Sequence, residues 1–419
     1  MQMFEADRRT PLFFVHIPKT AGSSMRIFLE NQYQSSRVCP AGNWHQMIRY
    51  APEEIRDFLL IQGHFPYYFK EMLPQEVKTL VLLRHPYNRT LSAVRHVQRD
   101  PGFDPLHERA KHMTVSEILS DGAFYHLLHN LQTYYLSAST PAIDVYDYMR
   151  TGNLIHEPRL SHLVDWAQDI NVAKRNLETI DFIGFSEDID SFMGNFCFKG
   201  LYHPAVAFPR DNDAPGGPSD FNNVDSDTLK RLEIINDLDM ELYEYAKLLT
   251  AQRAEEQPLN LRVRDIMRNL VENGVYKRYE ESFFIDLSGP IPGSGWHSAG
   301  SDGQSVRRWT GPHRQFSLEL PLSENAQFRA KMTFYSDRLI SYPDLSVEVN
   351  GFEVPTILSR NAKIYQLIFD IPPLLMSKVD GFCEIRFELS SVFCPADKGG
   401  KDIRQLGICV SAISFERLF

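Results

Sequence analysis

A lysine, a glycine and three hydroxyl residues lie within six positions near the start of the chain. They follow the apolar segment Leu12–Val15, which is typical of a buried parallel strand. They precede a segment in which Met25, Phe28 and Leu29 recur at helical spacing. Free N–H groups at the start of such a helix bind anions, and the ammonium of Lys19 adds a full positive charge. The loop Lys19-Thr20-Ala21-Gly22-Ser23-Ser24 therefore predicts a binding site for a phosphate-like group.

A second basic segment follows another apolar run, Thr79–Leu83. Arg84 closes this expected strand, and Ser92 lies two turns into the helix expected after it. A guanidinium group binds a phosphate through two parallel hydrogen bonds, and a hydroxyl group adds another. Ligands of open α/β sheets bind at the carboxyl ends of strands. Two anion sites at two strand ends suit one ligand that carries two separated anionic groups.

The two segments resemble those of sulfotransferases that use 3′-phosphoadenosine 5′-phosphosulfate (PAPS). In that family a Pro-Lys-Thr-x-Gly loop with two following Ser or Thr residues holds the 5′-phosphosulfate. A strand that ends in Arg-x-Pro-x-x-Arg-x-x-Ser holds the 3′-phosphate. The segment His16–Ser24 is similar to the carbohydrate-directed branch, which includes heparan and chondroitin sulfotransferases. Four further stretches within residues 11–250 fit that branch: Gln62–Tyr67, Asn130–Ser137, Phe182–Glu187 and Leu238–Ala246.

This resemblance implies PAPS as the sulfuryl donor and a role for each matching residue. During in-line transfer, negative charge builds on the leaving phosphate oxygen, and Lys19 would stabilise that charge. No metal or redox cofactor is implied. The residues that would bind the donor are Lys19, Thr20, Ala21, Gly22, Ser23 and Ser24 for the 5′-phosphosulfate, and Arg84 and Ser92 for the 3′-phosphate.

His64 occupies the family position of a catalytic histidine. It follows the strand-like run Leu59–Ile61, so it is expected at the same edge of the sheet. An imidazole suits the removal of a proton from an acceptor hydroxyl near neutral pH. Some relatives that sulfate hexuronic acids carry His-Gly-His where this chain has Gln62-Gly63-His64, so the resemblance does not imply that acceptor.

Other polar residues near these segments have more than one interpretation. His16 lies in the turn after the first strand and is interpreted as structural, whereas His45 matches a family position near the acceptor. Arg89 is either a second phosphate contact or a surface residue. Gln132 and Asn130 either line the acceptor cleft or form a polar pair between packed helices.

The 419 residues are enough for two or three domains, and a net charge of −10 argues against a general nucleic-acid binder. No apolar segment follows the first residues and none approaches a membrane span, so no signal peptide is expected. No membrane anchor is expected, unlike in Golgi-resident members of the family that the chain resembles, so a bacterial or otherwise cytosolic enzyme is expected. The five cysteines show no metal-ligand spacing, which favours reduced thiols in a cytoplasmic protein. They are Cys39, Cys197, Cys383, Cys394 and Cys409.

Alternating strand-like and helix-like segments predict an α/β domain at residues 1–250, with a parallel sheet flanked by helices. The resemblance implies a P-loop-like sulfotransferase fold for it. A linking helix is expected within residues 251–282, and alternating apolar residues predict an antiparallel β-sandwich at 283–419. The expected helices in the first domain are Ser23–Gln34, Arg89–Gln98, Val115–Ser120, Val164–Asn176 and Ser226–Leu249.

Three loops stand out in composition. Asn350-Gly351 after an alternating run is a strong hairpin signal. Asp211–Asp220 is either a surface connection or a flap over a ligand. Trp296 and Trp309, which flank a Gly/Ser-rich loop beside Arg307 and Arg308, either anchor the core or stack on sugars.

Three classes of function follow from these patterns. The leading one is transfer of a sulfuryl group from PAPS to a hydroxyl of a glycan or glycoconjugate, or alternatively of a lipid or small molecule. A nucleotide-dependent kinase is a second enzyme hypothesis, but the loop lacks both the Gly-x-x-x-x-Gly-Lys-Ser/Thr and the Gly-x-Gly-x-x-Gly spacing. A glycan-binding protein without catalytic activity is the third. The oligomeric state does not follow from the sequence.

Overall fold

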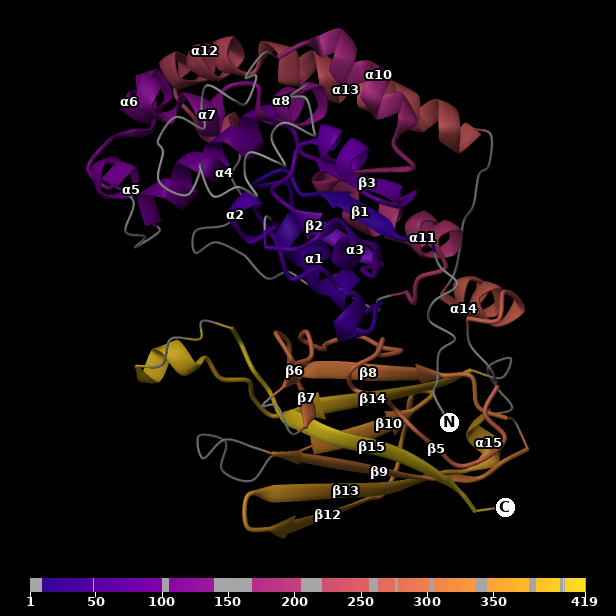
Figure 1. The fold of residues 1–419 in the computed structure, drawn as a ribbon. Coiled ribbons are helices and arrows are strands. Elements are labelled where there is room, and N and C mark those ends of the chain that lie inside the picture. Colours follow the sequence, from indigo (N-terminus) through magenta and orange to yellow (C-terminus); the bar gives the residue numbers. More distant parts are fainter. Residues whose placement is uncertain are drawn as a thin grey trace.

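The chain forms two regions that lie one above the other in Figure 1. The α/β region comprises residues 10–255, and the β region comprises residues 278–418. This computed structural model describes residues 10–47, 49–99, 105–138, 168–204, 221–255, 263–275, 278–301, 305–323, 325–335, 345–376, 382–399, 402 and 404–418. The loop expected at Asp211–Asp220 lies outside the described residues.

Four parallel strands form the sheet of the α/β region, in the order β2-β1-β3-β4. Successive residues of β1 point to opposite faces, so Phe13 and Val15 pack into one hydrophobic cluster while Leu12 and Phe14 pack into another. Burial on both faces explains why each strand reads as an unbroken apolar run. The strands are β1 (Leu12–Val15), β2 (Leu60–Gly63), β3 (Lys78–Leu83) and β4 (Phe182–Phe185).

Helices surround this sheet (Figure 1). In the described part of the chain, none of them combines the length and the apolar character of a membrane span. They are α1 (Gly22–Glu30), α2 (Trp44–Met47), α3 (Pro52–Arg56), α4 (Pro86–Arg99), α5 (Pro105–Ala110), α6 (Val115–Ser120), α7 (Tyr125–Leu128), α8 (Leu131–Ser137), α10 (Ile170–Thr179), α11 (Ile189–Gly200), α12 (Ser226–Ile235) and α13 (Asp237–Glu255).

The long helix expected from residue 226 is two helices, α12 and α13, which meet at Asn236. Asp225 caps the first, because its carboxylate accepts a hydrogen bond from the backbone N–H of Thr228 at 2.8 Å. Asn236 is fully buried, and its side chain donates to the carbonyl of Leu232 and accepts from the hydroxyl of Thr90. This local bonding offers the backbone an alternative to a continuous helix. The expected helix at Val164–Asn176 falls partly outside the described residues and is observed as α10.

Helix α14 (Val263–Glu272) joins the two regions and packs against α11. Its apolar stripe, Ile266, Met267 and Leu270, is buried. Its Asn269 donates a hydrogen bond to the carbonyl of Phe198 at the end of α11, at 2.9 Å. The linking helix α14 is therefore packed against the α/β region and does not only connect the two regions along the chain.

The β region contains two antiparallel sheets, as the alternating pattern predicts. Phe369 from one sheet and Phe387 from the other lie edge to face at 5.9 Å, and the buried residues of both sheets form one cluster. The larger sheet contains β5 (Phe283–Phe284), β6 (Gly300–Ser301), β7 (Val306–Trp309), β9 (Phe328–Tyr335), β12 (Thr356–Asn361), β13 (Ile364–Ile371) and β15 (Cys409–Arg417); the smaller contains β8 (Gln315–Leu320), β10 (Leu345–Val349), β11 (Phe352–Glu353) and β14 (Cys383–Leu389). A short helix, α15 (Pro373–Met376), follows β13.

The expected hairpin is present between β10 and β11. Asn350 and Gly351 both have positive φ, at 51° and 81°, as a two-residue turn of this kind requires. The side chain of Asn350 also accepts a hydrogen bond from the backbone of Glu384 on β14. Sequence reasoning does not find β12, whose residues are almost all exposed and therefore show no apolar alternation.

The end of α1 docks on the β region through buried hydrogen bonds. Asn31, the residue after α1, donates to the carbonyl of Trp296 at 2.6 Å and accepts from the guanidinium of Arg308. Arg308 is 1% exposed and also donates to the carbonyls of Leu287 and Gly289, at 2.8 and 2.7 Å. The indole N–H of the buried Trp296 donates to the carbonyl of Ser317 at 2.9 Å. Trp296 and Arg308 thus anchor the interface, whereas Trp309 is half-buried and lies edge to face with Phe393 at 5.8 Å.

One hydrophobic cluster extends across both regions. It includes Phe14 and Phe28 of the α/β region together with Phe316 and Phe334 of the β region. Near it, Nε2 of His203 lies 3.8 Å from a carboxylate oxygen of Glu319 on β8, and both side chains are buried. Burial lowers the pKa of His203 to about 3 and raises the pKa of Glu319 to about 8. The two groups are therefore uncharged at neutral pH.

Replacing Glu319 tests this buried carboxyl group. Because its pKa in the folded state lies above the usual 4.5, the stability gained from its neutral form is present below pH 4.5 and is lost as the pH rises to about 8. Glu319→Gln should remove that loss. The free energy of unfolding of the variant minus that of the wild type should therefore be larger at pH 8 than at pH 5, by about 2 kcal/mol or more. Urea denaturation at pH 5, 7 and 8 measures the difference.

The matched control is Glu353→Gln at an exposed position of the same region, which should follow the wild-type protein at every pH. A constant difference between Glu319→Gln and wild type from pH 5 to 8 would contradict the assignment.

Candidate functional site

The two predicted anion-binding segments meet at the carboxyl ends of β1 and β3. These strands are neighbours, and the strand order 2-1-3-4 reverses direction between them. Such a reversal opens a crevice in which ligands of open α/β sheets bind. The loop with Lys19 follows β1 and Arg84 follows β3, and the guanidinium of Arg84 donates to the carbonyl oxygen of Lys19 at 3.2 Å. The structure therefore places both segments side by side.

The loop after β1 has the backbone geometry of an anion cradle. Lys19 and Ala21 have φ values of 72° and 68°, in the left-handed region that non-glycine residues rarely adopt. The buried hydroxyl of Thr20 donates to the carbonyl of Ile17 at 2.9 Å and holds the turn between them. Helix α1 begins at Gly22 without a side-chain cap. Successive N–H groups in this conformation form a concave site for an anion.

Two side chains hold the backbone at the end of β3. The amide of Gln132 accepts from the N–H of Arg84 and donates to its carbonyl, both at 2.9 Å. The next residue, His85, donates its N–H to the carboxylate of Glu187 after β4, also at 2.9 Å. Burial lowers the pKa of Arg84, and Glu187 opposes that shift. Arg84 is thus a fixed cation whose guanidinium points toward the loop of Lys19.

Gln132 is placed by the start of α8. The backbone N–H groups of Gln132 and Thr133 donate to the buried carboxylate of Asp239 on α13, at 3.2 and 2.7 Å, which supplies a cap from another helix. Asn130 accepts from the N–H of Asp239 and donates to Asp237. Asn130 therefore belongs to helix packing, whereas Gln132 supports Arg84 instead of lining the acceptor pocket.

Ser92 lies partly buried on α4, two turns after Arg84. Arg95 follows it by three residues, so the two share one face of the helix. The charge of Arg95 acts on Arg84 and contributes to lowering its pKa. Sequence reasoning misses Arg95, although the three-residue spacing from Ser92 is a signal that could have identified it.

Arg89 fits neither of the two interpretations made from sequence. It is fully buried, and its guanidinium donates to the carbonyls of Leu127 and Leu128 at 3.0 and 2.7 Å, and to the hydroxyl of Thr90. Burial lowers its pKa to about 10, while Asp239 acts in the opposite direction. Arg89 is a structural cation that joins α4 to the end of α7.

His64 follows β2 and is oriented by the backbone of β1. Its Nδ1 lies 2.9 Å from the carbonyl oxygen of His16. A carbonyl only accepts, so Nδ1 carries the proton and Nε2 keeps a lone pair. Desolvation is the main cause that lowers the pKa of His64, and the charges of Arg26 and Lys19 add to it. The imidazole is therefore neutral near pH 7 and can accept a proton through Nε2.

His16 packs between other rings. Its imidazole stacks on Phe14, with centroids 5.4 Å apart and planes 8° apart, and lies 4.5 Å from the ring of His64. Desolvation lowers its pKa to about 3, so it stays neutral. A Cβ atom at Gly22 would come within 1.9 Å of this ring, so the glycine leaves the space that the imidazole fills. His16 therefore contacts both parts of the site: its ring packs against Gly22 at the start of α1, and its carbonyl orients His64.

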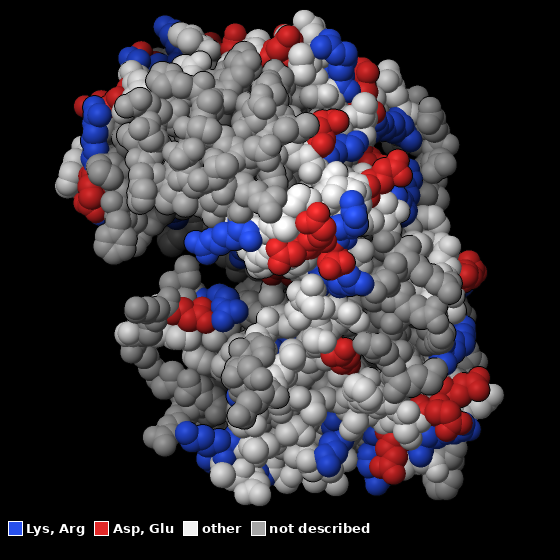
Figure 2. All heavy atoms as spheres, in the orientation of Figure 1, with Lys and Arg blue, Asp and Glu red and all other residues white. Residues whose placement is uncertain are grey.

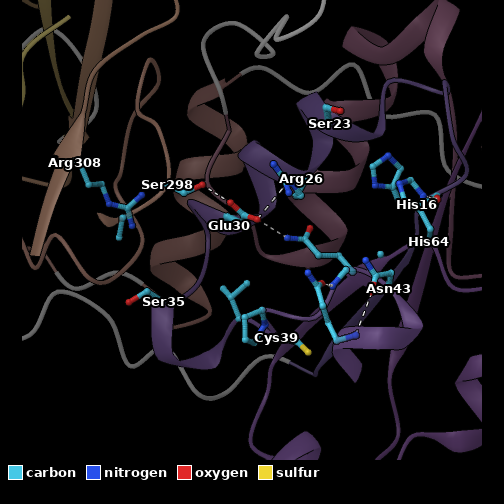
Figure 3. Close-up of a pocket in the computed structure, with 17 residues that line it drawn as sticks. His16, Ser23, Arg26, Glu30, Ser35, Cys39, Asn43, His64, Ser298 and Arg308 are labelled. Atoms are coloured by element: carbon cyan, nitrogen blue, oxygen red, sulfur yellow. Dashed lines mark hydrogen bonds and ion pairs between the residues drawn. The ribbon is translucent and has the colours of Figure 1, made fainter. Parts of the chain in front are cut away.

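A cavity of about 540 Å³ opens beside His64 (Figure 3). Ser23, His16 and His64 lie on one side of it, and Arg26 and Glu30 from the next turns of α1 line its middle. Sequence reasoning does not single out Arg26 or Glu30. His45 lies in α2 beside this cavity, but its side chain lies outside the described residues.

The face of the molecule shown in Figure 2 has mixed charge. The face shown in Figure 2 carries basic and acidic side chains interspersed, and it is hollowed between the two regions at the left of the view.

All five cysteines are buried and free of disulfide bonds. Among the described residues, no group of three or more His, Cys, Asp or Glu side chains is arranged to hold a metal ion.

Comparison with known proteins gives partial matches to sulfotransferases. The chain is 29% identical over 201 residues to human heparan-sulfate 6-O-sulfotransferase 1, across 43% of this chain and 45% of that protein. It is 29% identical over 195 residues to heparan-sulfate 6-O-sulfotransferase 1-B of Danio rerio, and 28% over 201 residues to the Mus musculus protein, with similar coverage. These similarities support a carbohydrate sulfotransferase family. The chain spans less than half the length of these relatives.

The other comparisons add little. No family model matches the chain. A family 35 carbohydrate binding module from Clostridium thermocellum aligns with 32% of this chain and 97% of its own, at 8% identity and a TM-score of 0.23. A likeness at that level carries no argument about fold or ligand.

Substitution of Gly22 tests the packing of His16. Gly22→Ala should displace the His16 ring and destabilise the protein by about 1–3 kcal/mol, as overpacking of a filled core does. The shift should also change the NMR signals of the His64 imidazole. Denaturation in urea and histidine ¹H–¹⁵N spectra measure the two effects.

Gly194→Ala is the control, because a Cβ there meets no atom within 4 Å and the residue lies inside α11. This variant should be as stable as wild type or more stable. Equal stability of the two glycine variants, with unchanged His64 signals, would contradict the packing described for His16.

Proposed function

We propose that this protein transfers a sulfuryl group from PAPS to a hydroxyl group of a glycan or glycoconjugate. The observation that carries the proposal is that three adjacent strands, β2, β1 and β3, end in His64, the Lys19–Ser24 loop and Arg84. Ser23 of that loop and His64 line one cavity. The partial similarity to heparan-sulfate 6-O-sulfotransferases supports the class of reaction. Residues 1–250 would form the sulfotransferase domain, 251–282 the link, and 283–419 an accessory β-sandwich.

The donor would be held at both of its anionic ends. The N–H groups and hydroxyls of the Lys19–Ser24 loop would bind the 5′-phosphosulfate, and Arg84 with Ser92 would bind the 3′-phosphate. Arg95 would add positive charge at the second position. The two left-handed residues of the loop and the uncapped start of α1 fit an anionic group of this kind.

The transfer step follows from these positions. The acceptor oxygen forms a bond to sulfur while the bond between sulfur and the 5′-phosphate oxygen breaks. The proton of the acceptor hydroxyl passes to Nε2 of His64. The electron pair of the broken bond stays on the phosphate, where Lys19 stabilises it, and adenosine 3′,5′-bisphosphate leaves. The backbone carbonyl of His16 stabilises the imidazolium that forms, because Nδ1 already donates to it.

Variants of Lys19 and His64 test these roles. Each of Lys19→Ala and His64→Ala should lower turnover by about 10²-fold or more, as the loss of such groups does. Lys19→Ala should also weaken binding of adenosine 3′,5′-bisphosphate, whereas His64→Ala should leave it unchanged. Calorimetry without Mg²⁺ measures binding, and transfer of labelled sulfate to N-acetylheparosan, chondroitin, glycolipids and phenols measures turnover.

His112→Ala, at an exposed histidine, is the matched control and should keep full turnover. Full activity of His64→Ala would overturn the base assignment. Failure of the wild-type protein to bind adenosine 3′,5′-bisphosphate would overturn the proposed donor. Transfer to a phenol but to no polysaccharide or glycolipid would instead favour a small-molecule acceptor.

The pH dependence of the reaction is a separate test. Only the neutral imidazole accepts a proton, so activity should fall as the pH drops through the pKa of His64. That pKa lies below the usual 6.5, so the acid limb of kcat/KM should be centred below pH 6.5. A pH profile from 5 to 9 checks this. An acid limb centred above pH 6.5 that persists in His112→Ala would count against His64 as the base.

A further inference from the structure

The cavity beside His64 has one wall that belongs to the β region. Ser298, Ala299 and Arg308 line it. In Figure 3, Ser298 and Arg308 lie on the side away from the two histidines. These residues follow the α/β region by more than forty positions in the sequence. The cavity in which the acceptor would meet His64 is thus formed by both regions.

A carboxylate of α1 joins the two walls. Glu30 accepts a hydrogen bond from the hydroxyl of Ser298 and another from the amide of Gln62 at 2.8 Å. The Nε atom of Arg26 lies 3.7 Å from the same carboxylate. Glu30 is partly exposed, with its side chain 20% accessible. It therefore presents carboxylate oxygens to the cavity between a cation and a hydroxyl of the β region.

The loop with Ser298 is fixed by buried anchors. On one side of it, the carbonyl of Trp296 accepts from Asn31 at 2.6 Å, and the N–H of His297 donates to the carbonyl of Trp309 at 2.9 Å. The carbonyl of His297 also accepts from the buried guanidinium of Arg308. The hydrogen bonds of Arg308 go to Asn31 and to backbone carbonyls, so its charge is used within the interface. These hydrogen bonds fix the segment with Ser298 and Ala299 next to α1, so it forms a fixed wall of the cavity.

We propose that the β region forms part of the acceptor site, in which Ser298, Ala299 and Glu30 hold a hydroxyl-bearing glycosyl unit against His64. Sugar hydroxyls donate to carboxylates and exchange hydrogen bonds with serine hydroxyls, and Glu30 and Ser298 supply one group of each kind. The small side chain of Ala299 leaves room for the ring. This inference rests on the proposed function, because it assigns the cavity beside His64 to the acceptor.

The test fills the cavity from the side of the β region. Ala299→Trp should weaken binding of an oligosaccharide at least tenfold while binding of adenosine 3′,5′-bisphosphate stays unchanged. Chitotetraose serves as a neutral probe and an N-acetylheparosan hexasaccharide as a carboxylated one, each titrated by calorimetry in the presence of adenosine 3′,5′-bisphosphate. Ala412→Trp, at an exposed alanine of β15, is the matched control and should bind as wild type does.

Ser298→Ala is a second, milder variant that does not add volume. It should raise KM for the bound glycan several-fold with kcat little changed, since it removes an acceptor contact and leaves His64 in place. Wild-type binding by Ala299→Trp, or wild-type KM in Ser298→Ala, would overturn the role of the β region. Failure of wild type to bind either glycan would overturn the glycosyl ligand. Failure to bind adenosine 3′,5′-bisphosphate would instead refute the proposed donor site, so the two outcomes are distinct.

Discussion

The hydrogen bonds of Asn31 to Trp296 and Arg308 constrain the rest of the site. They fix the end of α1 on the β region, while the start of the same helix belongs to the loop proposed to bind the 5′-phosphosulfate. Nine helical residues span only about 13 Å, so the cradle and the β region are held a short, rigid distance apart. Arg26 and Glu30 lie on the turns between them. Any movement of the β region against the sheet would therefore move the cradle with it.

Interactions with the backbone set the geometry of the reactive groups. The carbonyl of His16 orients His64, and the carbonyl of Lys19 accepts from Arg84. Gln132 in turn holds both backbone groups of Arg84, and Asp239 holds the start of the helix that carries Gln132. Each functional side chain is thus fixed by a second group whose own position is fixed by packing. This arrangement fixes the positions of the side chains that are proposed to act in the reaction.

The sequence predicts what depends on local pattern and misses what depends on docking. The expected strand Leu12–Val15 matches the observed strand to the residue, because a strand buried on both faces is an unbroken apolar run. Lys19, Arg84 and His64 follow strand ends, which topology brings together. Ser298 and Glu30 are 268 residues apart, and only the packing of α1 on the β region makes them neighbours.

Arg89 illustrates a different limit. In sequence, a buried arginine looks like an exposed one, because its burial depends on carbonyls that lie 38 and 39 residues further along the chain. The break at Asn236 is similar, since a buried partner on α4 stabilises it. The residues around Arg89 and Asn236 in the sequence do not indicate these hydrogen-bond partners, which lie far away along the chain.

The left-handed backbone of Lys19 and Ala21 has a consequence for the energetics of ligand capture. These conformations cost free energy. In the folded protein, the hydrogen bond from Thr20 to the carbonyl of Ile17 and the packing of His16 offset that cost. If the loop binds an anion as proposed, its N–H groups are already aligned, and little chain entropy would be lost on binding. Affinity at this loop would accordingly vary with the charge of the ligand and with salt, more than with any disorder-to-order change of the protein.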